Sequence, residues 1–156
     1  MLSKYGTAVS RARKRLSEAF DAKINEVYHG IAENEDKIDI KYKTEVANEG
    51  QYLEELTRGF ARDHALGHTS FGAHKDDYSF VFNGSDADGT ASRGEIRSIV
   101  IALKFIEAEM VETELYKKPL VLLDDVFSEL DEKRQKALAQ KFKDNQVIIT
   151  SVEGVN

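Results

Sequence analysis

The stretch from Leu120 to Asp131, which reads LVLLDDVFSELD, constrains the fold more than any other part of the chain. Four apolar residues run directly into two adjacent carboxylates, Asp124 and Asp125. A short uninterrupted apolar run is typical of a strand buried on both faces. In an open α/β sheet, ligands bind beyond the carboxyl ends of such strands. We therefore expect a buried strand that ends at the ligand-binding edge of an α/β sheet.

The two carboxylates need a cation, because burying an unpaired charge costs more than a strand returns. The usual cation at such a place is magnesium that carries a nucleotide. By position, Asp124 would hold the magnesium, and Asp125 would orient the water that attacks the terminal phosphate. Alternatively, both carboxylates cap the following turn or pair with Lys117 and Lys118. Asp131 fits a simple helix N-cap.

Length and composition are those of one soluble domain of ordinary size. The chain has 156 residues, of which 41% are hydrophobic, and it contains no cysteine. The missing cysteines exclude disulfides and thiolate metal sites and fit a reducing compartment. No apolar run approaches the ~20 residues that span a bilayer, and no secretion signal opens the sequence. We expect a cytoplasmic protein with no membrane partner.

The net charge of −6 argues against a surface that is cationic all over. Contact with nucleic acid would then need a local basic patch. The dense cluster of basic residues comprises Arg11, Arg13, Lys14 and Arg15. A solvated helix face is the alternative interpretation of this cluster.

The first 66 residues have the pattern of a small, mostly helical lobe. Apolar residues at steps of three, four and seven predict an amphipathic helix over about 8–33: Val9, Leu16, Phe20, Ile24, Val27 and Ile31. IDIKYK at 38–43 alternates as a half-buried strand does. A second helix is expected over 51–66 and would end at Gly67. No sustained heptads are present in this lobe.

Residues 67–156 carry the α/β pattern. Segments 68–72 and 77–84 are rich in aromatic and β-branched residues and predict strands, and a loop is expected over 85–91. The next helix has an apolar stripe of Ile96, Ile99, Val100, Leu103, Ile106 and Met110. Pro119 would stop helical structure before the apolar strand. A helix over 131–142 and a strand over 146–150 complete a strand–helix–strand unit, which predicts parallel neighbours.

The sequence Ser92-Arg93-Gly94-Glu95 at the start of the long helix has two interpretations. The first is a capping box, in which Ser92 and Glu95 satisfy each other's backbone amides. This does not explain Gly94, because glycine in a first turn costs up to ~1 kcal/mol relative to alanine. The second is a phosphate site made of free amides, a hydroxyl and an arginine. Local sequence leaves both open.

Residues 71–78, FGAHKDDY, contain a histidine and two further carboxylates. Together with His64 and His68 they could be read as a zinc site, although Gly67 interrupts the helix that would align those two histidines. A metal-dependent hydrolase centred on His74, Asp76 and Asp77 is the corresponding alternative function.

Four segments, in this order and at these spacings, resemble the second half of the RecF family of bacterial DNA replication and repair proteins. They are Arg62–Gly67, Gly72–Asp77, Ala91–Glu95 and Leu122–Asp131. The resemblance runs from about residue 2 to residue 151. It implies part of an ABC-type ATPase sheet (P-loop NTPase-like) over 67–156, with residues 1–66 belonging to a helical second lobe.

The resemblance also implies a function. Members of the family form head-to-tail homodimers around ATP, bind double-stranded DNA and gapped or single-stranded DNA, and help recombination mediator proteins to load the strand-exchange recombinase.

The same resemblance assigns roles to individual residues. Ser92, Arg93, Gly94 and Glu95 match the signature motif, which contacts the ATP of the partner subunit. Asp124 matches the Mg²⁺ ligand, and Asp125 stands where many relatives carry a catalytic glutamate. Asp131 ends the loop that communicates across the dimer, and Thr150 or Ser151 falls where related enzymes place a switch histidine.

Two features depart from the family pattern. The chain contains no G-x-x-x-x-G-K followed by Ser or Thr, so the loop that cradles the phosphates is missing. Ala73 replaces the proline of the family's G-P-H segment. We therefore expect a C-terminal portion that neither holds nor hydrolyses ATP by itself and whose sheet has unpaired edges. Another ABC-type chromosome-organising or break-repair ATPase and a non-catalytic interaction module remain as alternatives.

Overall fold

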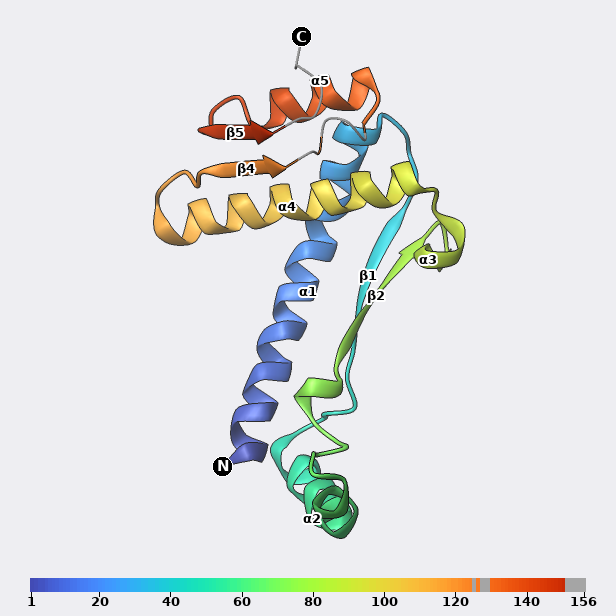
Figure 1. Cartoon of the computed structure of the whole chain (residues 1–156), viewed down its shortest axis with the longest axis vertical. Helices are drawn as coiled ribbons and strands as arrows, with labels where there is room; N and C mark the ends of the chain where they lie inside the picture. Colours follow the sequence, from blue (N-terminus) through green and yellow to red (C-terminus); the bar gives the residue numbers. More distant parts are fainter. Residues whose placement is uncertain (125, 127–129, 151–156) are drawn as a thin grey trace.

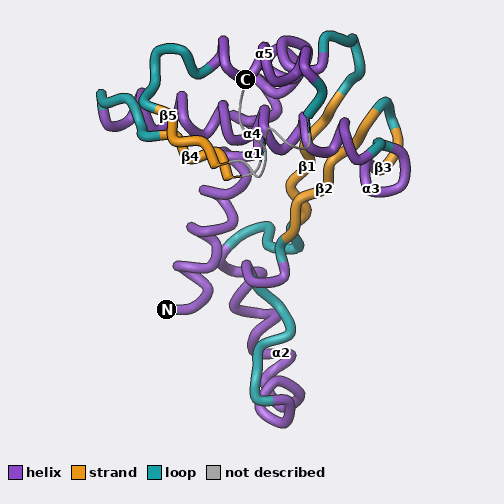
Figure 2. Tube along the Cα trace, turned by 45° about the horizontal axis from the view of Figure 1, so that its top comes forward, coloured by secondary structure: helices purple, strands orange, loops and turns teal. Residues whose placement is uncertain are grey.

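The computed structural model describes residues 1–124, 126 and 130–150. Helix α1 (Leu2–Ala32) forms a stalk, and helix α4 (Arg93–Leu115) crosses its upper end (Figure 1). Helix α2 (Glu49–Leu66) lies at the opposite end of the molecule, near the N-terminus (Figures 1 and 2). The remaining elements are β1 (Ile38–Lys43), η1 (Ala73–Lys75), β2 (Asp77–Phe82), β3 (Ser85–Asp86), α3 (Ala87–Thr90), β4 (Val121–Asp124), α5 (Glu132–Lys141) and β5 (Val147–Thr150). No helix among the described residues is long and apolar enough to cross a membrane.

Strands β1, β2 and β3 form an antiparallel sheet that runs alongside α1 (Figure 1). The register pairs Ile38 with Phe82 and Lys43 with Asp77. Between β2 and β3, Asn83 and Gly84 have φ of 49° and 85°, the positive values that a tight hairpin turn requires. The predicted strand at 38–43 is confirmed. The expected loop at 85–91 is wrong, because this turn directs the chain into β3 and the single turn of α3.

The predicted strand at 68–72 is also wrong. The chain bends there and leads into η1. Phe71 packs edge-to-face on Tyr52, with ring centroids 5.4 Å apart. Gly72 has φ of 136° and lies so close to the Tyr52 ring that a Cβ would be 2.0 Å from its hydroxyl. Burial of Phe71 against α2 therefore outweighs the β propensity of this segment.

Strands β4 and β5 are parallel neighbours joined through α5, as predicted. The expectation that the β4 strand is buried on both faces is wrong for this structure. Leu122 is 68% exposed, and its register partner Ile148 is 49% exposed. Val121 and Leu123 instead pack against the core. In the described residues this sheet has two strands, so nothing there covers the Leu122 face.

One main core lies where α1 passes beneath α4. Its fully buried members are Ile24, Tyr28, Ile31, Ile38, Ala102, Ile106 and Leu138. They come from both sides of residue 66, and β1 pairs with β2 across the same point. The core therefore joins residues 1–66, which we call the arm, to the strand–helix–strand unit of β4, α5 and β5.

The upper and lower halves of α1 bury different kinds of side chain. The predicted apolar stripe is buried in the upper half, at Ile24, Val27 and Ile31. Below α4 the helix instead buries small residues: Ser3, Gly6, Thr7, Ser10 and Ser17. Val9 and Leu16, which were expected to be on the buried face, are 42% and 44% exposed.

The chain around η1 is tied to α1 and β1 by polar contacts. Asp76 accepts hydrogen bonds from Ser10 Oγ, at 2.6 Å, and from the Tyr42 hydroxyl. Arg13 donates to the Ala73 carbonyl. Asp76 thus links α1 to the β1–β2 hairpin.

Two tyrosine hydroxyls are expected to affect stability in opposite ways. The fully buried Tyr28 hydroxyl makes no well-formed hydrogen bond among the described residues, and Asn34 is the side chain that interacts with it, whereas Tyr42 donates to Asp76. Tyr28→Phe should leave the free energy of unfolding unchanged or raise it, because a buried polar group whose hydrogen bond is poorly formed costs free energy, up to about 1–3 kcal/mol when it is unsatisfied. Tyr42→Phe should lower it by roughly 1 kcal/mol. Urea denaturation of both variants tests the pair, and a large loss in Tyr28→Phe would contradict it.

Candidate functional site

Asp124 is the last residue of β4, and its side chain is exposed. It pairs in register with Thr150 of β5, whose hydroxyl donates to Asp124 Oδ1. Parallel pairing brings the two carboxyl ends together and so fixes the carboxylate at the edge of the sheet. Asp124 borders a cleft of about 300 Å³. The cleft is also lined by Val126 and Leu130 and by four residues of α4: Ile96, Arg97, Val100 and Ile101. Asp125, Ser128, Glu129 and Ser151 lie outside the described residues.

The start of α4 is a complete capping box. Ser92 Oγ accepts from the Glu95 amide at 3.3 Å, and Glu95 Oε2 accepts from the Ser92 amide at 2.6 Å. The capping interpretation is therefore confirmed. It leaves the second interpretation open, because a serine hydroxyl that accepts a hydrogen bond can still donate its proton. The Arg93 and Gly94 amides belong to the first turn, where helices lack intrahelical acceptors.

Arg134 of α5 joins two of the predicted segments, and sequence reasoning missed it. Its Nη1 donates to Asp131 Oδ2 at 2.9 Å. The same atom lies 3.4 Å from the position that a Cβ on Gly94 would occupy. Asp131 and the first turn of α4 therefore meet around one guanidinium. Arg134 Nε is buried and has no hydrogen-bond partner among the described residues.

Asp131 caps α5, as predicted, by accepting from the Arg134 amide at 2.9 Å. This backbone hydrogen bond, together with the charge of Arg134, lowers the pKa of Asp131 below its ordinary value of 3.8. The group is therefore a fully charged carboxylate at neutral pH. It stabilises the helix N-terminus through both the amide contact and the helix dipole.

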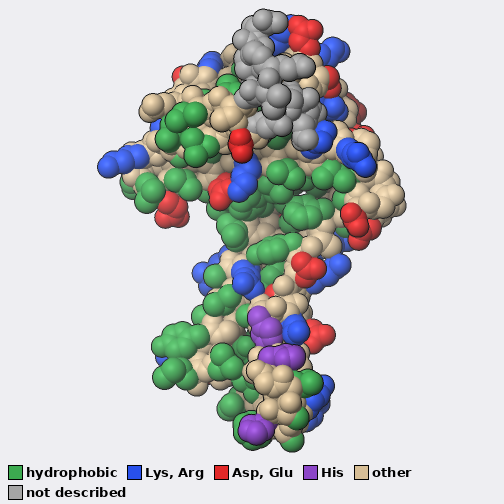
Figure 3. Space-filling view, viewed as in Figure 1, with side chains coloured by type: hydrophobic (Ala, Val, Ile, Leu, Met, Phe, Trp, Pro, Cys, Tyr) green, Lys and Arg blue, Asp and Glu red, His purple; other side chains and the backbone are tan. Residues whose placement is uncertain are grey.

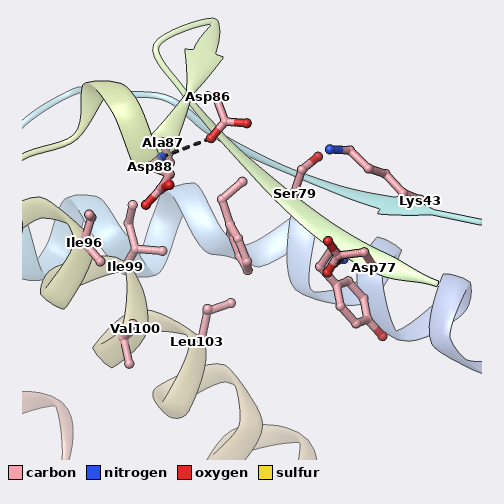
Figure 4. Close-up of a pocket in the computed structure, with 12 residues that line it drawn as sticks. Lys43, Asp77, Ser79, Asp86, Ala87, Asp88, Ile96, Ile99, Val100 and Leu103 are labelled. Carbon is pink, nitrogen blue, oxygen red and sulfur yellow. Dashed lines mark hydrogen bonds between the residues drawn. The ribbon is translucent and has the colours of Figure 1, made fainter. Parts of the chain in front are cut away.

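A second cleft, of about 490 Å³, lies between β2 and α4 (Figure 4). Ile96, Ile99, Val100 and Leu103 of α4 line one side, and Asp77, Asp86 and Asp88 lie with Lys43 on the other. Asp86 accepts from the Asp88 amide at 3.1 Å, so part of this acidic group serves the local turn. Nothing in the geometry directs these carboxylates to one point.

The histidine-containing segment is explained by structural contacts. His74 Nε2 lies 2.8 Å from the Thr69 carbonyl oxygen. Asp76 accepts hydrogen bonds from Ser10 and Tyr42, and Asp77 accepts one from the Tyr78 amide. Over the described ranges no group of three or more His, Cys, Asp or Glu residues could hold a metal ion. The zinc hydrolase alternative therefore has no structural support within the described residues.

The predicted basic patch lies on the lower half of α1, away from Asp124 and Ser92. Arg11, Lys14 and Arg15 are exposed. Arg13 points to another side of the helix and donates to the Ala73 carbonyl, so it has a structural contact within the chain.

The chain is similar to RecF proteins in sequence and in fold. No protein-family model matches the chain. The DNA replication and repair protein RecF of Lachnoclostridium phytofermentans is 34% identical over 146 residues, which are 94% of this chain and 40% of that protein. RecF of Moorella thermoacetica is 35% identical over 149 residues, again 40% of its length. A solved structure of the recombination mediator protein RecF-ATP in the RecFOR pathway has a TM-score of 0.82 and 27% identity, and covers 99% of this chain and 44% of that chain.

This chain is a homologue of the C-terminal part of RecF. It spans about two fifths of the length of the curated relatives that it matches. The likeness to the RecF-ATP structure covers both the arm and the strand–helix–strand unit. The α/β fold with its helical arm therefore matches that of RecF structures.

The lowered pKa of Asp131 predicts a specific dependence of stability on pH. A carboxylate whose pKa is lowered by folding stabilises the folded state above its unfolded pKa, and this contribution is lost as pH falls through the folded pKa. Asp131→Asn should therefore lower the thermal unfolding midpoint at pH 7, and the difference from the parent should shrink at pH 2 to 3. A difference of the same size at both pH values would show that charge on Asp131 does not matter.

Proposed function

We propose that this chain provides the C-terminal portion of an ATP-dependent RecF-type DNA repair protein. In that role it would contribute one half of each composite ATP site. The observation that carries the proposal is the exposed Asp124 carboxylate at the end of β4, oriented by Thr150, in a chain that matches RecF in sequence and fold. We also propose residues 1–66 as part of the helical second lobe and residues 67–156 as part of the ATPase lobe.

Asp124 fits the role of a Mg²⁺ ligand. Magnesium prefers oxygen donors, keeps several waters, and in nucleotide sites needs one or two carboxylates in addition to phosphate oxygens. Asp124 offers an exposed carboxylate, one oxygen of which accepts from Thr150. When bound, Mg²⁺ would neutralise phosphate charge at this edge of the sheet. Asp125 is proposed, on the resemblance, as the residue that orients the attacking water.

The start of α4 fits the role of a signature motif that serves a partner subunit's nucleotide. Ser92 and Arg93 are exposed, so they can reach a ligand brought by another molecule. A helix N-terminus, a hydroxyl and an arginine together favour a phosphate. Glu95 is occupied in the capping box and helps to hold Ser92 in place. Arg134 positions Asp131 beside this helix end, which suits Asp131 to contact the same partner across the proposed homodimer.

ATP binding would depend on residues outside this sequence. The 156 residues contain no phosphate-cradling loop, so the chain is expected to complete a site that the N-terminal part of RecF relatives begins. The solved relative is a structure of RecF-ATP in the RecFOR pathway. On that basis we propose ATP as the ligand and DNA with recombination mediator proteins as partners.

The half-site proposal is tested in a RecF-length chain, made by joining this sequence to the preceding part of the Lachnoclostridium phytofermentans relative. The joined chain should hydrolyse ATP in the presence of Mg²⁺, and Asp124→Asn should reduce kcat by about 100-fold or more, because a transition-state contact is lost. Asp144→Asn, an exposed aspartate near the start of β5, should have no effect. If the 156-residue chain turned over ATP by itself, or if Asp124→Asn changed only stability, the half-site would be wrong.

DNA binding by the α1 patch predicts a change in salt dependence. In the RecF-length chain, Arg11→Glu with Lys14→Glu should reduce the slope of log Kd against log salt by about two, because two phosphate contacts are lost. Lys133→Glu with Lys143→Glu, at exposed positions in and after α5, is the matched control and should leave the slope unchanged. Fluorescence anisotropy with gapped duplex DNA measures both slopes. An unchanged slope in the first variant would remove the patch from the DNA interface.

A further inference from the structure

Arg134 places a positive charge at the starts of two helices. It is the third residue of α5, and its Nη1 atom lies 3.4 Å from the position that a Cβ on Gly94, in the first turn of α4, would occupy. The first turn is the positive end of a helix dipole, where anions are stabilised and cations are not. The Arg134 side chain is 23% exposed, so water screens this repulsion incompletely. The helix dipoles therefore disfavour a cation at this place.

Capping of α5 does not explain the arginine side chain. Asp131 Oδ1 caps the helix by accepting from the backbone amide of residue 134 at 2.9 Å, which every residue except proline supplies. The side chain of Arg134 instead donates to the second oxygen, Asp131 Oδ2. Arg134 Nε is buried without a hydrogen-bond partner among the described residues, which costs free energy. Stability of the cap therefore gives no reason for an arginine here.

The ion pair changes the charge that a ligand meets at the start of α4. Asp131 is charged at neutral pH and 54% exposed, and its Oδ2 shares the Arg134 Nη1 atom with the first turn of α4. An unpaired carboxylate so close would repel a phosphate. Once Asp131 is paired, the helix dipole and Arg93 remain to attract an anion. Figure 3 shows Lys and Arg side chains on the surface around the end of α4 at which the helix begins.

The other acidic residues of the two first turns have different partners. Glu95 accepts from the Ser92 amide at 2.6 Å in the capping box. Glu132 pairs with Lys136 at 2.7 Å, on the exposed side of α5. Asp131 is therefore the carboxylate at these helix starts whose charge is balanced by Arg134.

We propose that Arg134 acts through Asp131: it neutralises and holds this carboxylate, and so allows the start of α4 to accept the terminal phosphate of a nucleotide carried by a partner subunit. Ser92 and Arg93 would contact that phosphate. Arg134 is a positioning residue, because its Nη1 is occupied by Asp131 and its Nε is buried. This role rests on the half-site proposed above and identifies the residue that makes it attractive to an anion.

The experiment measures ATP hydrolysis by the RecF-length joined chain described above. Arg134→Gln should raise KM for ATP by at least about tenfold, because removal of one unit charge leaves Asp131 to repel the phosphate. The kcat value at saturating ATP should change by less than about threefold. Arg134→Lys should keep KM within about threefold of the parent, because it keeps the charge. Circular dichroism of the 156-residue variants should show an intact fold.

Two further measurements separate a charge effect from a structural one. Raising KCl from about 50 mM to about 500 mM should reduce the ratio of the Arg134→Gln and parent KM values, because salt screens the carboxylate. In a chain that also carries Asp131→Asn, Arg134→Gln should raise KM by no more than about threefold, since no carboxylate remains to be neutralised.

Lys136→Gln is the matched control, because it removes the same charge and an ion pair from α5, at a side chain that is 75% exposed. It should leave KM unchanged. The role of Arg134 is overturned if Arg134→Gln leaves KM unchanged, if Arg134→Lys is as defective as Arg134→Gln, or if Asp131→Asn does not reduce the effect. A parent joined chain that hydrolyses no ATP would instead overturn the half-site, and this role with it.

Discussion

Packing of the upper half of α1 beneath α4 is the contact on which the rest of the structure depends. Ile24, Tyr28 and Ile31 are almost completely buried there, and each buried aliphatic or aromatic side chain contributes about 1.5–3 kcal/mol. The same residues pack against β1, and β1 pairs with β2 in the antiparallel sheet. The arm and the strand–helix–strand unit therefore share one core, and neither has a separate core of comparable size among the described residues.

Around this core, polar residues at helix ends place the residues of the proposed site. Ser92 and Glu95 fix the first turn of α4, and Asp131 fixes that of α5. Arg134 then links the two helix starts, with Gly94 providing room for its guanidinium. Capping and the proposed function are compatible here, because a cap that holds a serine rigidly also presents its hydroxyl at a defined position.

Much of this arrangement was predictable from sequence because it rests on local pattern. The strand at 38–43, the helix end at Gly67, the capping box and the parallel strands around α5 all follow from spacing and turn chemistry. Three features required the structure. Segment 68–72 bends because Phe71 packs on Tyr52, a contact between distant positions. Leu122 is exposed because the number of strands beside β4 cannot be read from β4 itself. Arg134 carries no motif, and its role appears only when α4 and α5 meet.

The dimensions of α1 have a mechanical consequence. A helix of 31 residues is about 46 Å long at 1.5 Å per residue. Its upper half packs in the main core, and its lower half is tied to the chain around η1 through Ser10 and Arg13. If α1 and the elements tied to its lower half tilted together by about 5° at the α4 crossing, the N-terminal end of α1 would move by roughly 4 Å over this length. The stalk therefore has the geometry of a lever, which converts a small rearrangement beside the α4 crossing into a movement at the opposite end as large as a side chain.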